Sequence, residues 1–155
     1  MGRLYIESLS KKIKLTHIAN AVYKTLEQKD DLKAELIFVS GEEIRRLNYE
    51  TRKVDGITDV LSYPSLDGVK GEILKKKDYP TELDGRYLFI GSIVVCEDKI
   101  KEQAKEIGHS YITERTYLIV HGLMHLFGYD HLKEEDKKEM RDKEKKALKL
   151  LGVEQ

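Results

Sequence analysis

Residues 121–131 read HGLMHLFGYDH and contain three of the five histidines of the chain. His121 and His125 stand four positions apart in an apolar run that is typical of a buried helix. Their imidazoles therefore lie only about 40° apart around that helix, one turn above the other. Gly128 ends the helix, because glycine takes the left-handed conformation at little cost. The chain then turns back, and His131 can approach the same point from outside the helix.

Three neutral imidazoles with one open position are typical of a catalytic zinc site. A histidine pair at this spacing is also compatible with ordinary core packing, but burying an imidazole without a partner in an apolar helix is costly. The glycine and the third histidine follow at a spacing that closes a three-ligand set. We therefore predict one zinc ion per chain bound by His121, His125 and His131, although nickel, copper and iron also suit three imidazoles.

The composition indicates a single soluble domain without a strong overall charge. The 155 residues contain 28 Lys and Arg against 28 Asp and Glu, so any nucleic-acid contact needs a local patch. No apolar run is long enough to span a membrane, and no signal peptide is recognisable. Cys96 is the one cysteine, which excludes an intrachain disulfide framework. We expect one cytoplasmic domain over residues 1–155 that has no membrane partner.

Strand and helix patterns alternate early in the chain, and helices dominate later. The predicted strands cover residues 3–9, 33–39, 58–63 and 87–96. The predicted helices cover residues 16–29 (with Thr16 as N-cap), 97–107, 113–127 and 133–151, and a short helix opens at the capping box Ser40-Gly41-Glu42-Glu43. This order predicts an α+β fold with a single mixed sheet of about four strands covered by helices.

Two stretches between these elements are predicted to lack regular structure. Residues 48–57 are polar and contain Gly56, which favours a loop. Residues 65–86 are charged and glycine-rich, and we interpret them as a long hairpin connection or a lid. The metal-site helix lies in the C-terminal third of the chain.

The histidine spacing resembles the HExxHxxGxxH arrangement of metzincin peptidases, with one decisive difference. Gly122 occupies the position of their glutamate general base. Peptide hydrolysis is therefore disfavoured, unless a carboxylate such as Glu114 or Asp59 reaches the open metal position. An anionic phosphodiester suits a three-histidine metal better, because that centre carries more positive charge than one with a carboxylate ligand.

Residues 121–131 also resemble the signature of the YbeY family of bacterial metal-dependent endoribonucleases. A second block, LNYETRKVDGITDVLSYP over residues 47–64, is similar to the family pattern LNxx(Y/F)RxxDxPTDVLSFP. A third, weaker match is IGSIVVC over residues 90–96. The sequence departs from the pattern in three places: Met124 replaces a leucine, Gly56-Ile57 stand in place of a single position plus proline, and Ser92 replaces an aspartate.

The resemblance implies a metal-dependent endoribonuclease of single-stranded RNA, acting in ribosomal RNA processing, including maturation of the small-subunit 3′ end, and in ribosome quality control. It implies ribosomal RNA and the ribosome or a small-subunit precursor as partners, and not DNA. It also makes Arg52 the functionally important arginine beside the substrate cleft. An arginine fork can grip phosphate oxygens through two hydrogen bonds.

Several alternatives stay open at this point. Asp130 and Ser62 are candidates for orienting the metal ligands, or else serve the turn and the strand in which they lie. A zinc metallopeptidase is the alternative enzyme. A non-catalytic ribosome-associated factor, whose metal only ties the last helix to the core, is the alternative without an enzyme. The sequence does not indicate an oligomeric state.

Overall fold

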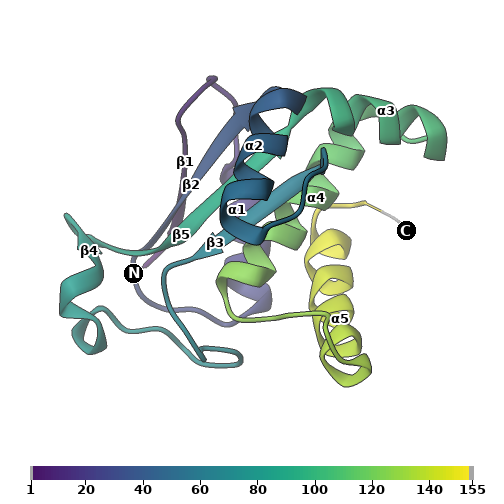
Figure 1. Ribbon diagram of the computed structural model, residues 1–155. Coiled ribbons are helices and arrows are strands. Elements are labelled where there is room, and N and C mark those ends of the chain that lie inside the picture. The colour runs from purple at the N-terminus through teal and green to yellow at the C-terminus, as the bar shows by residue number, and fades with distance from the viewer. Residues whose placement is uncertain (1, 154–155) are drawn as a thin grey trace.

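The computed structural model describes residues 2–153, which fold into five α-helices packed around one mixed β-sheet (Figure 1). The strands are β1 (Leu4–Ser8), β2 (Leu32–Val39), β3 (Val60–Pro64), β4 (Leu83–Asp84) and β5 (Tyr87–Cys96). Their order is β1-β2-β5-β3, and the short β4 pairs with β5. β1, β2 and β5 run parallel, whereas β3 and β4 run antiparallel to β5. The predicted α+β fold with a single mixed sheet is confirmed, and the two-residue β4 brings the strands to five.

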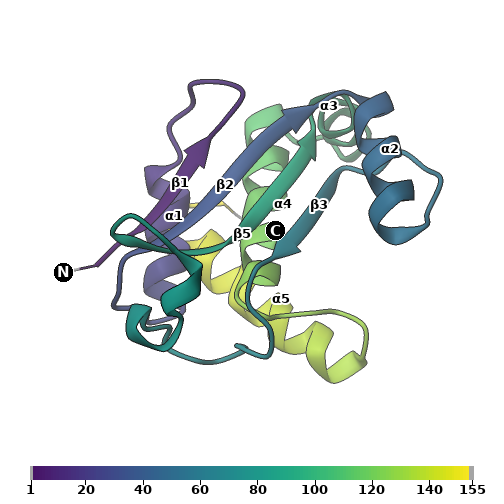
Figure 2. The same ribbon diagram turned by 60° about the vertical axis from the view of Figure 1, so that its left-hand side comes forward.

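The helices divide unevenly between the two faces of this sheet. They are α1 (Thr16–Thr25), α2 (Gly41–Arg52), α3 (Glu97–Ile107), α4 (Tyr111–Leu126) and α5 (Glu134–Leu150). α1, α4 and α5 pack against one another on one face, where the larger apolar core lies, and α2 lies on the other face (Figures 1 and 2). A smaller apolar cluster under α2 is built on Ile44, Leu61, Val94 and Cys96. α4 is therefore the central helix of the main core.

β5 carries the local irregularity that lets α4 approach the sheet. Its register with β2 shifts by one residue at Ile90, between the pairs Lys33–Phe89 and Ala34–Gly91. Gly91 has φ +139°, and a Cβ atom there would lie 2.8 Å from the Leu126 side chain and against the Tyr63 carbonyl oxygen. This close approach requires glycine. The end of α4 consequently lies directly over the junction of β5 and β3.

Two local predictions are wrong. Thr16 is the first helical residue of α1 and not its cap, and no side chain caps that helix. Residues 48–52, predicted as loop, are the end of α2, which stops at Lys53 in a left-handed conformation with φ +60°. The amide of the buried Asn48 donates to the Gly56 carbonyl at 3.1 Å, so this polar residue is satisfied within a helix. Arg52 consequently projects from the last turn of α2.

The connection between β3 and β5, residues 65–86, is pinned to the core. Leu66, Val69 and Leu74 are buried in it. The side chain of buried Gln28 donates to the Glu72 carbonyl at 2.9 Å and accepts from the Leu74 amide at 3.0 Å. Two short 3-10 turns, η1 (Lys76–Asp78) and η2 (Pro80–Glu82), follow. The hairpin connection expected here is present. Its first half, residues 65–74, is packed against the core by these buried side chains and hydrogen bonds.

Candidate metal centre and cleft

The turn that ends α4 delivers the third histidine. The Tyr129 amide donates to the Met124 carbonyl at 3.0 Å and the Gly128 amide to the His125 carbonyl at 3.0 Å, a pattern typical of a glycine-terminated helix. Gly128 has φ +91°, and a Cβ there would lie 2.7 Å from the Lys70 backbone nitrogen. Glycine is thus required both by the left-handed turn and by the Lys70 backbone packed against it.

The structure brings the three predicted histidines together. His121 and His125 project from adjacent turns of α4, and His131 comes from the loop before α5. One ring nitrogen of each lies within 4.8 Å of the others. The ring centroids are 4.7 Å apart for His121 and His125, 5.0 Å for His125 and His131, and 5.5 Å for His121 and His131. Within residues 2–153 this cluster of three contains no carboxylate.

Hydrogen bonds at Nδ1 of two of the histidine rings determine which ring nitrogen faces the middle of the cluster. His121 Nδ1 donates to Glu144 Oε2 of α5 at 2.5 Å, and His125 Nδ1 donates to the Tyr129 carbonyl at 2.9 Å. Each bond leaves Nε2 as the nitrogen that can take a metal. A carboxylate or carbonyl behind a ligating imidazole fixes the ring orientation and raises its basicity. Glu144 is buried, with 6% of its surface exposed, and this bond gives its carboxylate a hydrogen-bond partner.

The protonation of the cluster also suits a cation. Burial, together with the positive charges that His121 and His131 would carry, lowers the pKa of His125 to about 4. His125 is therefore neutral at pH 7, and neutral imidazole is the form that binds metal. Three imidazoles, two of them oriented by hydrogen bonds on the opposite ring nitrogen, fit a zinc ion by the chemistry of the donor set.

The two residues suggested as orienting partners have other contacts. Asp130 Oδ1 accepts a hydrogen bond from the His131 backbone amide at 2.7 Å, which stabilises the turn before that histidine. Ser62 is buried on β3, and its backbone carbonyl accepts from Arg52 Nη2 at 2.6 Å. Both line the cleft beside the histidines, but neither side chain is bonded to an imidazole in the described residues.

A cleft of about 550 Å³ joins the histidines to Arg52. Arg52 projects into it from the end of α2, held by the Ser62 carbonyl and lying 5.5 Å from the centre of the Tyr63 ring. The loop that follows Arg52 is tied back to α2, because the Asn48 side chain donates to the Gly56 carbonyl at 3.1 Å. The cleft wall is formed by Asn48, Thr58, Asp59, Val60, Leu61, Ser62, Pro64, Asp130 and Leu132.

The carboxylates considered for a peptidase are held by one glutamine. Gln103 Nε2 donates to Asp59 Oδ2 at 3.0 Å and to Glu114 Oε2 at 3.3 Å. Asp59 lines the cleft, whereas buried Glu114 lies two turns before His121 on α4 and is not part of the cleft wall. Gly122 is buried, and a Cβ at this position would lie 3.0 Å from the Ile93 side chain of β5. A glutamate there would face the sheet and not the metal.

Two residues that hold side chains of the site, Glu144 and Gln103, were not predicted from the sequence. Ser92 lies outside the cleft. Glu144 sits in a helix full of charges, and the available signal was its helical spacing from Met140, Ala147 and Leu148, which are buried on the same face. Gln103 had no local signal. Ser92, which stands in the place of the family aspartate, faces Glu35 on β2 with its Oγ 3.5 Å from Oε1 and does not line the cleft.

Comparison with known proteins gives a consistent family. A family model described as Endoribonuclease YbeY matches residues 5–152. A curated Endoribonuclease YbeY from Clostridium botulinum (strain Alaska E43) is 37% identical over 163 aligned residues, covering 97% of this chain and 98% of that protein. A second, from Clostridium perfringens (strain SM101), is 40% identical and covers 95% of this chain and 89% of that protein.

A solved structure agrees with the sequence matches. The solution structure of TM1509 from Thermotoga maritima aligns with a TM-score of 0.61 at 25% identity, covering 95% of this chain and 89% of that one. No helix in residues 2–153 is both long and apolar enough to cross a membrane. The family model and the two clostridial relatives are named as an endoribonuclease, so the peptidase and the purely structural metal factor are not favoured.

Proposed function

The chain belongs to the YbeY family, and from that premise we propose that it is a metal-dependent endoribonuclease that cleaves single-stranded RNA during ribosomal RNA processing. Its substrates are precursors of ribosomal RNA, including the small-subunit 3′ end, and it also serves ribosome quality control in the cytoplasm. Its partner is the ribosome or a small-subunit precursor. One observation carries the proposal: a three-imidazole cluster and an arginine share one cleft.

We assign the metal site to His121, His125 and His131, with one zinc ion per chain. Bound there, zinc supplies a Lewis acid that polarises a phosphate oxygen and makes a water molecule more acidic. The hydrogen bonds that His121 donates to Glu144 and His125 donates to the Tyr129 carbonyl hold two of the three rings in place before metal arrives. This arrangement reduces the ordering cost of binding.

Arg52 is the residue that we assign to the phosphate. Within residues 2–153 the Arg52 side chain donates a hydrogen bond through Nη2 only, so the remaining N–H groups of the guanidinium can face the cleft. A guanidinium matches the geometry of two phosphate oxygens and retains its charge at any physiological pH. In this position it binds the scissile phosphate and stabilises the negative charge that develops on it.

The test combines metal content with RNA cleavage. Zinc is measured by plasma mass spectrometry on the purified protein and on a His121→Ala/His125→Ala variant, and both are incubated with single-stranded ribosomal RNA fragments. We expect about one zinc per chain and internal cleavage, both lost in the variant. His17→Ala, on the exposed face of α1, is the matched control and should retain both. Bound zinc without cleavage in the wild type would support the structural-metal alternative instead.

A further inference from the structure

A second hollow of about 280 Å³ lies on the other side of the histidine cluster from Arg52. It shares four wall residues with the main cleft: Asp59, Val60, His121 and His131. The remaining wall comes from α4 and from α5. The two hollows therefore meet at the metal site, and a linear polymer bound across that site has space to continue on both sides.

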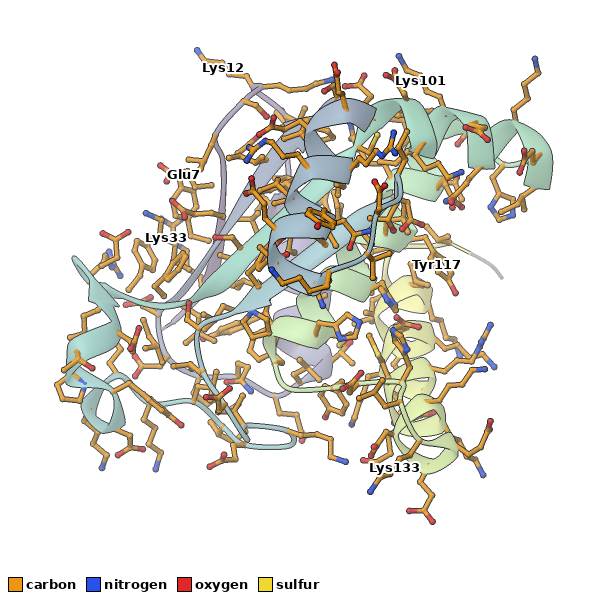
Figure 3. All side chains as sticks on the ribbon, viewed as in Figure 1. Glu7, Lys12, Lys33, Lys101, Tyr117 and Lys133 are labelled. Atoms are coloured by element: carbon orange, nitrogen blue, oxygen red, sulfur yellow. The ribbon has the colours of Figure 1, made fainter. Side chains whose placement is uncertain are left out.

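The α5 side of this hollow carries two basic side chains without an ion-pair partner in the described residues. Lys137 and Arg141 lie one helical turn apart on α5, and both are exposed. Within residues 2–153 neither side chain takes part in an ion pair or hydrogen bond. Figure 3 labels Lys133, just before α5, and Tyr117, another wall residue of the hollow, on α4.

Three acidic residues of α5 near these cations are already paired. Asp136 and Glu139 of α5 both bind Lys70, and Asp142 binds Lys146. The two carboxylates that line the hollow are also engaged: Glu144 accepts from His121, and Asp59 accepts from Gln103. Lys137 and Arg141 are therefore the two basic residues of the hollow wall that remain available to an anionic ligand.

We infer that this hollow is a binding site for the sugar-phosphate backbone of single-stranded RNA next to the cleaved bond, with Lys137 and Arg141 contacting its phosphates. The inference rests on the proposed function and extends it: Arg52 holds the scissile phosphate, and the α5 cations hold the chain beyond it. Exposed lysine and arginine bind backbone phosphates without regard to base. The site therefore contributes affinity and register, and not sequence preference.

The experiment measures binding without cleavage. Zinc-loaded protein is titrated with fluorescent 2′-O-methyl oligoribonucleotides of two to eight residues, in which the 2′-hydroxyl is blocked. We expect Lys137→Ala/Arg141→Ala to weaken octamer binding on the order of tenfold and to lower the salt slope by about 1.4, the value for two phosphate contacts on a single strand. The difference from wild type should shrink as the oligomer shortens, because a dinucleotide cannot reach from the metal site to both cations.

The matched control is Lys138→Ala/Lys145→Ala, which removes the same charge from exposed positions of α5 outside both hollows. Equal zinc content in all variants shows that the metal site is intact. If the two double variants bind alike, or if the wild type does not bind the octamer, the proposed site is wrong. Cleavage of unmodified RNA, measured in parallel, separates this outcome from failure of the proposed function: weaker binding in a protein that cleaves nothing would keep the site and reject the nuclease.

Discussion

The two sides of the cleft are held in different ways. His121 and His125 are fixed from behind by Glu144 and by the Tyr129 carbonyl, on a helix buried in the main core. Arg52 is an exposed residue on the last turn of α2, and its side chain donates one hydrogen bond, to the Ser62 carbonyl, within residues 2–153. A metal site gains affinity when its ligands are arranged in advance. A phosphate-binding side chain gains affinity when it can adjust its conformation to the bound phosphate.

Removing the Arg52 guanidinium tests this difference between the two sides of the cleft most strongly. We expect Arg52→Ala to lower kcat/KM for RNA by about 100-fold, as loss of one charged donor to a transition state does. Zinc content and the unfolding midpoint should stay at wild-type values, because Arg52 binds no histidine. Arg46→Ala, on the same helix but paired with Glu43 and Glu50, is the control and should retain activity. Loss of zinc from Arg52→Ala would contradict the separation of the two sides.

Disturbing the turn beneath the histidines should reduce stability. We expect Gly128→Ala to lower the free energy of unfolding by about 2 kcal/mol, because φ is positive and the added Cβ meets the Lys70 backbone. Gly152→Ala is the matched control: φ is +74° there, but nothing lies within 4 Å of the added atom, so its cost should be about 1 kcal/mol. Urea unfolding of the zinc-free proteins measures both. Equal losses would show that the Lys70 contact does not matter.

Weakening the support behind one ligand should have a smaller effect, confined to the metal. We expect Glu144→Gln to reduce zinc affinity about tenfold, within the range for loss of a partner behind a ligating histidine. Competition with a chromophoric chelator measures this affinity directly and does not depend on RNA cleavage. Asp142→Asn on the exposed face of α5 is the control. Unchanged affinity in Glu144→Gln would mean that burial of the ring, and not its partner, sets its orientation.

The smallest effect is expected away from both sides of the cleft, in the acid stability of the fold. Burial of Asp31 acts to raise its pKa, but the hydrogen bond and charge of Arg86 and the charge of Lys76 outweigh it and lower the pKa. The ionised carboxylate therefore stabilises the fold above its unfolded pKa of about 3.9, and this stabilisation is lost as the pH falls through the lower folded value.

Asp31→Asn should accordingly flatten the decline of the thermal midpoint between pH 6 and pH 3 relative to wild type. Circular dichroism melts across that range measure the decline. Asp67→Asn, an exposed position in the β3–β5 connection, serves as control. Zinc affinity and RNA cleavage at pH 7 should remain unchanged in both variants. A fall in either would mean that the cleft is coupled to this distant ion pair.

The features that sequence reasoning predicted are those with a local physical cause. Ser40 caps α2 by accepting from the Glu43 amide, and α3 ends at Gly108 with φ +85°, as expected from each residue type. The α4 histidine spacing and the turn at Gly128 needed only helical geometry. The predicted α+β fold followed from the order of such segments.

The features that were missed depend on tertiary contacts. Glu144 is acidic among many charges, and only the packing of α5 on α4 brings it to His121. The end of α2 was taken for loop because Asn48 is polar, yet its amide is satisfied by the Gly56 carbonyl eight residues later. The cations of the second hollow can be recognised only from the packing of α5 on α4, which brings Lys137 and Arg141, but not Lys138 or Lys145, to its wall. A pattern of residues does not contain this information.

The packing of Gly122 on Ile93 restricts which chemistries this scaffold can reach through mutation. A glutamate after the first histidine is the single change that would bring the motif to the metzincin pattern, but that side chain would enter the sheet core, where the nearest Ile93 atom already lies 3.0 Å from the Cβ position. The substitution would reduce folding stability without adding a general base to the cleft. An evolutionary path from this nuclease to a peptidase would therefore need a smaller residue at 93 first, and that change alone carries no catalytic advantage.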